Sequence, residues 1–362
     1  MLKTPVFYKR VNRVTRSIYK GFMAGRGIAS KPNACIFTVT KKCNGKCLMC
    51  NVWKDKAEDD LGIKDIEKIF SDPLLDSIES LHLYGGEPTL RKDLVGIVKI
   101  ALKKCKKLKT IGFSTNCVAY KPALEKIKGI LEILPQDFEK LNVRLSLDGL
   151  EGVHNKVRGL PFVFDNAMLM LEELKKIQKS NSKLGVSIGC VIQPANVHQL
   201  DKIYEFIKSN KLEYAFNHLI INPSSFFSNT KNKELTFTDS QIKKITAFLK
   251  RISGEQIYEE LYTNDIINMY WGKRRSKSRG CVFGYSTIFI ENNGDVFMCM
   301  NNKSAKLGNA LETDLSRIWF SKKADAIRKD IKSYCGTCRS DCGKNWYDIV
   351  RYILKKKIGL LK

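Results

Sequence analysis

The sequence has no long apolar run, since none of its hydrophobic stretches approaches the roughly 18 residues that suggest a membrane-spanning helix. The first thirty residues are rich in Lys and Arg but contain no continuous apolar segment, so they do not resemble a secretory signal. Internal repeats and low-complexity tracts are also missing. These absences argue against a membrane-spanning, secreted or repeat protein, and we expect a cytoplasmic location.

Acidic residues are few relative to basic ones: 37 Asp and Glu stand against 63 Lys and Arg, a net charge of +26. Such a field attracts polyanions, including nucleic acid and anionic membranes. Much of the charge lies at the edges, because residues 1–34 hold eight basic residues and no acidic one, and the chain ends in "YILKKKIGLLK". No basic patch is interleaved with aromatic residues that could stack on bases, so we do not expect nucleic acid as a partner.

Residues 1–32 predict a basic amphipathic helix. Its apolar residues recur at helical spacing, and its basic residues fall on the opposite face: Phe7, Val11, Val14, Ile18 and Phe22 against Lys9, Arg13, Arg16 and Lys20. Residues 346–362 have a similar character. Both helices could pack on the protein and expose a solvated basic face, or lie on an anionic membrane as a peripheral contact at its inner face. The second interpretation would allow a lipid-linked substrate.

From Ala34 to Ile221 short β-rich runs alternate with helical patterns. The predicted strands are "ACIFTVT", "SLHLYGG", "TIGFSTN", "NVRLSLDG", "GVSIGCVI" and "YAFNHLII", and the predicted helices span about 63–70, 94–105, 122–134, 164–177 and 197–209. This alternation predicts right-handed βαβ units and a parallel sheet, open or curled toward a barrel. Polar residues cluster where these strands end, and parallel α/β folds bind ligands at that edge.

The alternation stops after residue 221, and the rest of the chain has a different pattern. We divide the chain into the N-terminal helix (1–32), a barrel (33–235), a helical linker (236–279), a smaller region (280–345) and a basic C-terminal helix (346–362). The smaller region begins with a hairpin signal, "STIFIE", the turn "NNGD", then "VFMCM", and ends in "CGTCRSDC".

The twelve cysteines favour metal sites or catalysis, because a reducing compartment disfavours structural disulfides. Cys43, Cys47 and Cys50 lie within eight residues after the first strand, in a loop that contains Gly45. Soft thiolates select zinc, copper(I) or iron–sulfur clusters. A structural zinc needs four ligands, and neither His nor Cys nearby completes this set. Three thiolates on a 4Fe–4S cubane leave one iron open for a group other than protein.

The C-x3-C-x2-C spacing directly after the first strand resembles the radical S-adenosylmethionine (SAM) enzymes, over about residues 33–221. The resemblance implies a partial (β/α)6 TIM-like barrel in the α/β class. It also implies a 4Fe–4S cluster whose open iron is chelated by SAM, and reductive cleavage of SAM to a 5′-deoxyadenosyl radical that abstracts a substrate hydrogen. A low-potential electron donor such as flavodoxin or ferredoxin is the implied partner.

The resemblance also implies a set of SAM-contacting residues. They are the glycine motif "GGEP" for the SAM amino group, polar pairs at the ends of strands three and four, an arginine for the carboxylate, and contacts to ribose or adenine: Gly85, Gly86, Glu87, Pro88, Ser114, Asn116, Ser146, Asp148, Arg158, Gln193, Asn196 and Met49. Met49 stands where the family usually has an aromatic, and Cys117 where it usually has Gly. We interpret Cys117 as a small core residue. Taken alone, Asp148 could shape a turn, and His154 could lie on the surface.

A second cysteine set, Cys281, Cys299, Cys335, Cys338 and Cys342, resembles the auxiliary-cluster extensions called SPASM and twitch. A complete SPASM has more cysteines and two clusters, so five suit one fully ligated 4Fe–4S cluster, and we favour the first four as ligands with Cys342 as a spare. A structural zinc is the alternative. A closed cluster can accept an electron from a substrate radical, which implies a net oxidation or a rearrangement.

Three hypotheses follow for the function. The first is a radical SAM oxidoreductase that acts on a small molecule such as a sugar, an aminocyclitol or a lipid-linked intermediate. The second is a peptide maturase, against which we set the shortness of the segment before the barrel. The third is a non-catalytic iron–sulfur or zinc protein. No general base is identified; Glu87, Asp148, Glu213 and His218 are candidates by strand position alone.

Overall fold

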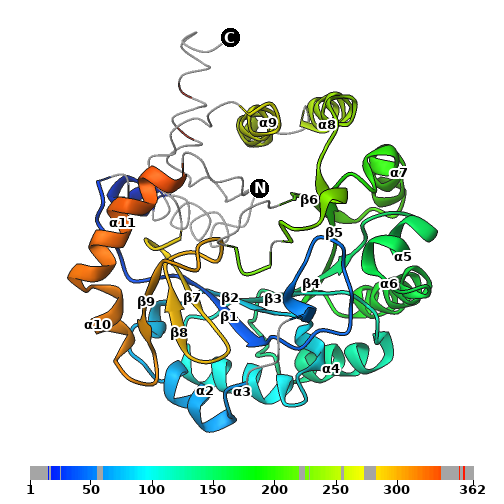
Figure 1. Ribbon diagram of the computed structural model, residues 1–362. Helices are drawn as coiled ribbons and strands as arrows, with labels where there is room; N and C mark the ends of the chain where they lie inside the picture. The colour runs from blue at the N-terminus through cyan, green and yellow to red at the C-terminus, as the bar shows by residue number, and fades with distance from the viewer. Residues whose placement is uncertain are drawn as a thin grey trace.

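The computed structural model describes residues 15, 18–24, 26–54, 60–219, 225–227, 229–253, 257–272, 283–335, 350 and 354, with the backbone alone for 257–262 and 331–335. The strands within these ranges form one sheet in the order β6-β5-β4-β3-β2-β1-β7-β8-β9 (Figure 1). The sheet is strongly curved and does not close, and helices cover its convex side (Figure 1).

The first strands pair in parallel, each followed by a helix, so the predicted partial (β/α)6 barrel is confirmed. The strands are β1 (Ala34–Thr40), β2 (Ser80–Gly85), β3 (Thr110–Thr115), β4 (Lys140–Ser146), β5 (Leu184–Ile192) and β6 (Glu213–His218). The helices are α2 (Ile63–Phe70), α3 (Leu94–Lys104), α4 (Tyr120–Ile133), α5 (Gly152–Arg158), α6 (Val163–Ser180) and α7 (Leu200–Ser209).

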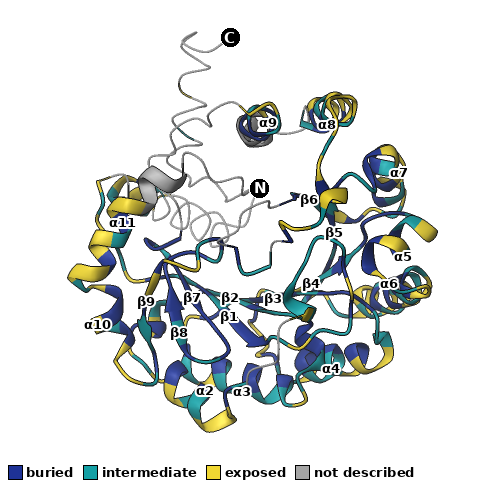
Figure 2. Ribbon diagram, viewed as in Figure 1, coloured by how far each residue is buried: buried dark blue, intermediate teal, exposed yellow. Residues whose placement is uncertain are grey.

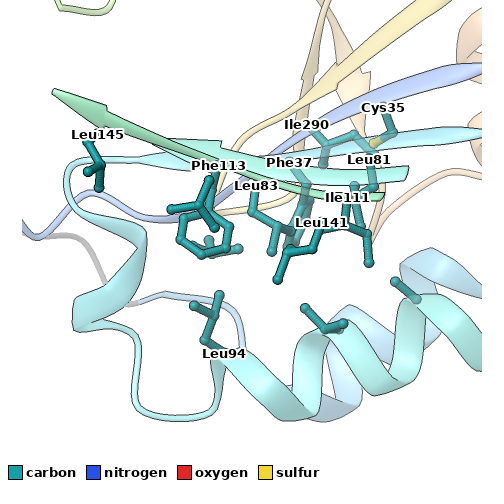
Figure 3. Packing of buried hydrophobic residues seen from close by; sticks show 14 of the residues in the cluster. Cys35, Phe37, Leu81, Leu83, Leu94, Ile111, Phe113, Leu141, Leu145 and Ile290 are labelled. Carbon is teal, nitrogen blue, oxygen red and sulfur yellow. The ribbon is translucent and has the colours of Figure 1, made fainter. Parts of the chain in front are cut away.

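The hydrophobic core lies between the sheet and the helices. Apolar residues alternate along each strand and point to the convex side, among them Phe37, Leu83, Phe113 and Val143, all fully buried. Figure 3 shows several of these side chains directed from the strands toward the helix that carries Leu94. Each fully buried aliphatic or aromatic side chain contributes about 1.5–3 kcal/mol relative to an exposed one, so this layer is the main source of stability. Figure 2 shows the strands buried and the outer faces of the helices exposed.

The concave face of the same strands is polar instead. Each of these strands places a polar residue next to a core residue, and adjacent residues of a strand point to opposite faces. The polar residues on the concave face include Thr38 on β1, His82 on β2, Ser114 on β3 and Arg144 on β4. Burial, with a smaller contribution from Arg144, lowers the pKa of His82 to about 4. The interior of a complete TIM barrel is filled by branched apolar side chains. A polar interior therefore indicates a ligand site.

The hairpin that we assigned to a separate small region joins the barrel sheet. Strand β7 (Thr287–Ile290) pairs in parallel with β1, and β8 (Asp295–Phe297) and β9 (Lys306–Asn309) continue the sheet in antiparallel fashion. The hairpin turn contains Gly294, as the "NNGD" signal predicted. The remaining helices are α8 (Asp239–Ile252), α9 (Ile257–Tyr270), α10 (Leu315–Trp319) and α11 (Lys322–Cys335).

Of the predicted N-terminal helix, residues 15, 18–24 and 26–32 are described, and residues 15 and 18–24 are helical. The predicted C-terminal helix lies outside the described residues except for residues 350 and 354. The proposed division into five segments stays a prediction. Across the described part of the chain, no helix combines the length and the apolar character needed to cross a bilayer.

Candidate active site

The loop after β1 gathers the thiols of Cys43 and Cys47 around Gly45. A Cβ atom placed on Gly45 would lie 3.5 Å from Cys47 Sγ, 3.9 Å from Cys43 Sγ and 3.3 Å from the side-chain amide of Asn116. A Cβ at this position would be in van der Waals contact with both thiols and tight against the Asn116 amide, so there is little room for a side chain. The middle of the loop is held by α5, because the N–H groups of Lys46 and Leu48 donate to carbonyl oxygens at its end at 3.0 Å each.

Burial of the loop disfavours charged thiolates in the metal-free chain. Desolvation raises the pKa of Cys43 to about 11 and that of Cys50 to about 12. Thiolate is the form that binds metal, so iron binding here must release protons.

The glycines of "GGEP" bring the end of β2 into contact with the start of this loop. A Cβ on Gly85 would lie 2.0 Å from the Thr40 carbonyl oxygen, and one on Gly86 would lie 2.3 Å from that of Lys42. Gly85 also has a φ of 150°, which side chains rarely adopt. The N–H of Gly86 donates to Thr40 O and that of Glu87 to Lys42 O, both at 2.9 Å. Only glycine permits this approach.

Glu87 is buried and links the ends of β2 and β3. Its Oε1 accepts hydrogen bonds from the N–H and the hydroxyl of Thr89 at 3.2 and 2.6 Å, and its Oε2 accepts from the N–H of Asn116 at 2.7 Å. Burial raises the pKa of Glu87, and these hydrogen bonds oppose the rise. The Asn116 amide, held in this way, donates to Asn44 Oδ1 at 2.9 Å and lies 3.8 Å from Cys43 Sγ.

Asp148, Arg158 and Cys47 form a chain of contacts at the end of β4. The Asp148 carboxylate accepts from the N–H of Val191 at 2.7 Å and pairs with Arg158 Nη2 at 2.5 Å. Arg158 Nη1 lies 3.5 Å from Cys47 Sγ. Burial alone would lower the pKa of the Arg158 guanidinium, but Asp148 and Cys47 raise it, so a cation faces the sulfur. The resemblance assigned Arg158 to the SAM carboxylate; here its contact is with Asp148, while its Nε is buried and has no hydrogen-bond partner among the described residues.

His154 packs next to Asp148 and is fully buried, so its interpretation as a surface residue is wrong. Its Nδ1 accepts from the N–H of Asp148 at 3.0 Å, and burial followed by the Arg158 charge lowers its pKa to about 3. Asn196 is equally buried and donates to the carbonyl oxygens of Asp148 and Val191 at 2.8 and 2.9 Å. Both residues fix the turn that presents the Asp148 carboxylate.

Gln193 reaches the cluster loop from β5. It is fully buried, its amide nitrogen lies 3.8 Å from Met49 Sδ, and its Oε1 has no partner among the described residues. A buried unpaired amide oxygen costs about 1–3 kcal/mol, so it marks a place where a ligand donor fits. Ser114 and Ser146 are half-buried at the ends of their strands.

One candidate for a general base, Glu213, does not fit the site. It is the first residue of β6 and is exposed, so it lies at the opposite edge of the parallel sheet from the cluster loop. His218 ends β6 at the edge where the loop lies, and its ring contacts the Tyr270 hydroxyl of α9 at 3.1 Å. Cys117, by contrast, is buried in the hydrophobic core as predicted.

The auxiliary cysteines are only partly described. Cys299 is buried just after β8, where its sulfur accepts from the N–H of Asn301 at 3.3 Å. Cys335 ends α11 with its side chain undescribed, and Cys281, Cys338 and Cys342 lie outside the described residues. Their ligand assignment stays a prediction.

The residues present fit a cluster with one open iron. Within the described ranges, no three His, Cys, Asp or Glu side chains stand in metal-binding geometry as they are. The donor set is nonetheless three cysteines on one short loop, with Arg158 and Asn116 directed at two of the sulfurs. Cationic and amide donors stabilise thiolates. The unpaired Gln193 oxygen leaves a further polar position beside the loop.

Comparison with known proteins identifies the architecture. The model of the radical SAM superfamily matches residues 37–207, and that of the SPASM iron–sulfur cluster-binding domain matches residues 281–343. The chain contains a radical SAM domain. The predicted cofactors of such a protein, SAM, its 4Fe–4S cluster and auxiliary iron–sulfur binding in the SPASM region, are confirmed at the level of these domains.

Individual relatives of this radical SAM protein are distant. Fe-coproporphyrin III synthase of Methanosarcina barkeri is 25% identical over 209 residues, 57% of this chain and 48% of the relative. PqqA peptide cyclase of Bradyrhizobium diazoefficiens is 26% identical over 277 residues, 74% of this chain and 66% of the relative. The chain therefore spans about half of the first relative and just under two thirds of the second. The solved structure of anSMEcpe with bound AdoMet and Cp18Cys peptide has a TM-score of 0.61 at 19% identity and covers 91% of this chain and 98% of that one, which supports the fold.

Proposed function

We propose that this chain is a radical SAM enzyme that modifies a peptide or protein substrate. The observation that carries the proposal is the open three-cysteine set of Cys43, Cys47 and Cys50 beside polar side chains at the strand ends. With a 4Fe–4S cluster and SAM bound, such a site supplies one-electron cleavage of SAM and removal of a hydrogen atom from the substrate. Arg158 holds positive charge at Cys47, and Gln193 and the strand-end serines offer hydrogen bonds to SAM.

A peptide substrate is better supported than the small molecule that we first expected. PqqA peptide cyclase is among the relatives, and anSMEcpe carries a bound peptide. The expectation that a peptide maturase needs a separate N-terminal domain loses its force, because this chain covers nearly all of anSMEcpe. Fe-coproporphyrin III synthase keeps a small-molecule substrate as the second candidate.

Deuterium transfer would separate the two candidates. The anaerobically reconstituted enzyme would be incubated with SAM, dithionite and extract from cells grown in deuterated medium, divided into peptides and small molecules. We expect deuterium in 5′-deoxyadenosine from the peptide fraction, with loss of this signal after protease digestion. Deuterium from the protease-resistant small-molecule fraction alone would contradict the peptide proposal. Cys47→Ala should abolish 5′-deoxyadenosine in both arms.

The electron donor would be an acidic low-potential protein such as a flavodoxin or ferredoxin. Lys42 and Lys46 flank cysteines of the cluster loop, and Lys156 lies on the helix against which that loop packs. All three side chains are exposed, and none has an acidic partner among the described residues. Complementary charge accelerates association and fixes orientation, so these lysines favour docking of an acidic protein next to the cluster.

The closed auxiliary cluster would accept an electron from the substrate radical. Counting iron and sulfide distinguishes its two forms, because two cubanes give about eight irons per chain and one cubane with a zinc site gives about four. Peripheral membrane contact by the basic termini stays a separate hypothesis. Co-sedimentation with anionic vesicles, with and without residues 1–30, tests it.

A further inference from the structure

A buried polar network joins the β7–β8 hairpin to both ends of the loop that carries Cys43, Cys47 and Cys50. Because β7 runs parallel to β1, its last residues leave the sheet at the same edge as the loop does. The two residues after β7, Glu291 and Asn292, are 4% and 1% exposed although both are polar. Their partners lie on either side of the loop.

Glu291 contacts the strand that enters the loop. The hydroxyl of Thr38 donates to its Oε1 at 3.3 Å, and Lys41 Nζ lies 3.7 Å from its Oε2. Lys41 is the first residue after β1 and is two positions before Cys43. A carboxylate from the hairpin thus holds the entry to the loop.

Asp60 connects the entry, the exit and the hairpin. It follows the loop in the sequence, and its Oδ2 accepts from the Thr40 hydroxyl at 2.7 Å while its Oδ1 accepts from Asn292 Nδ2 at 3.1 Å. Thr40 Oγ1 in turn accepts from the N–H of Lys42 at 3.1 Å, and Arg91 Nη1 lies 3.8 Å from Asp60 Oδ2. The carbonyl oxygen of Asn292 accepts from the N–H of the residue after Asp60 at 3.0 Å. The Asp60 carboxylate therefore joins the end of β1, the segment that follows the loop and the β7–β8 hairpin.

The unsatisfied oxygen of Asn292 indicates that its amide group has a specific role. Asn292 Oδ1 is buried and has no partner among the described residues, so the amide is retained despite an unsatisfied oxygen. An apolar side chain would avoid that cost. What Asn292 contributes is the donor to Asp60, and Asp60 in turn orients Thr40 at the start of the cysteine loop.

We propose that Asp60, Glu291 and Asn292 are positioning residues, through which the hairpin of the SPASM region fixes the ends of the SAM-cluster loop. Within the barrel, helix α5 holds the middle of the same loop, and Gly86, Glu87 and Arg91 contact its ends. The hairpin adds a further restraint on those ends from outside the (β/α)6 unit. This inference rests on the proposed function in one respect, that SAM binds the iron left open by the three cysteines.

A reciprocal exchange tests the Asp60–Asn292 contact. Asn292→Asp sets two carboxylates against each other, and Asp60→Asn replaces the charged acceptor of the Asn292 amide by a neutral one. The double variant restores an amide donor facing a carboxylate and leaves an oxygen at position 60 for the Thr40 hydroxyl. We expect SAM to bind about tenfold more weakly to each single variant, because the buried hydrogen bond between an amide and a carboxylate is lost. The double variant should recover most of that affinity. The readout is the SAM-induced change in the electron paramagnetic resonance signal of the reduced cluster, titrated with SAM.

Asp295→Asn is the matched control. Asp295 lies on the same hairpin, but its carboxylate contacts Asn293, Asn309 and Lys306 and no described residue of the loop. It should bind SAM as the unaltered protein does. Equal SAM affinity in all variants, equal loss in Asp295→Asn, or no recovery in the double variant would each overturn the inference.

A second readout separates this inference from the proposed function. If the unaltered protein showed no SAM-sensitive signal, the proposed SAM site would fail, and the rate at which a chelator removes iron would still judge the network. We expect faster iron loss in both single variants and recovery in the double variant. Identical rates in all of them would refute the positioning role.

Discussion

His154→Asn isolates one buried group whose protonation opposes folding. The Nδ1 of His154 accepts from the N–H of Asp148, and an asparagine side-chain oxygen can accept the same hydrogen bond. A protonated imidazole would instead set its own Nδ1–H against the backbone N–H of Asp148, and the hydrogen bond would be lost. Burial, followed by the nearby Arg158 charge, disfavours the protonated ring and lowers the pKa of His154 from 6.5 to about 3.

The sign of the pH dependence follows from this direction. Because the folded pKa lies below the unfolded one, the unfolded chain binds more protons between about pH 3 and 6.5, and stability falls as the pH drops through that range. Between pH 7 and pH 5 the unfolded chain takes up a proton on this histidine that the folded protein does not, which lowers the free energy of unfolding by about 2 kcal/mol. This loss should be absent in His154→Asn.

Urea unfolding of the metal-free protein at the two pH values measures the effect. The free energy of unfolding should fall by about 2 kcal/mol more in the unaltered protein than in His154→Asn. His198→Asn is the matched control, because it makes the same substitution at an exposed histidine. An equal fall in the unaltered protein and in His154→Asn would refute the argument that burial keeps this imidazole neutral.

Three further predictions concern the site. Cys47→Ser should remove 5′-deoxyadenosine formation and lower the iron content from about eight to about four per chain if the auxiliary site holds a cubane, whereas unchanged iron would contradict the assigned ligand. Gly85→Ala should lower the free energy of unfolding by more than about 3 kcal/mol, because its Cβ would overlap the Thr40 carbonyl oxygen; Gly152→Ala, with open space around its Cβ, should change it by at most about 1 kcal/mol. The double charge reversal Lys46→Glu with Lys156→Glu should weaken binding of reduced flavodoxin about tenfold in calorimetry and leave the rate of 5′-deoxyadenosine formation with dithionite unchanged. The control is the same reversal at the exposed Lys106 and Lys107, beyond the end of α3, which should not change flavodoxin binding. An equal loss of binding in the control would contradict the docking proposal.

The barrel could be predicted from the sequence because its information is local. Alternating apolar residues define each strand, and β1 begins and ends where the pattern of "ACIFTVT" does. The cysteines, "GGEP", Asn116 and Asp148 were found because each follows a strand directly, and parallel pairing brings all strand ends to one edge. Glu213 was a wrong candidate because it stands at the start of its strand, and the first residue of a parallel strand lies at the edge of the sheet opposite the site.

The contacts that could not be predicted either join residues far apart in the sequence or involve residues with no distinctive local pattern. Pairing of β7 with β1 joins segments about 250 residues apart, and local periodicity says nothing about such a partner. Asp60 lies in the acidic run "EDD", which is typical of a solvated loop, so its buried contacts with Thr40 and Asn292 carry no sequence signal. His154 stands alone on a short helix, where its burial depends on the tertiary structure.

The same pairing sets how the two cluster sites relate in the proposed reaction. Cys43 follows the carboxyl end of β1, whereas Cys299 comes two residues after β8, which runs back along β7 toward the amino end of the sheet. One strand of seven residues at about 3.3 Å per residue separates these two levels by roughly 20 Å. The polar concave face, with Thr38, His82 and Arg144, lies along that span. If Cys299 ligates the auxiliary cluster as predicted, a substrate on this face would lie between the SAM end and the auxiliary end of one continuous sheet.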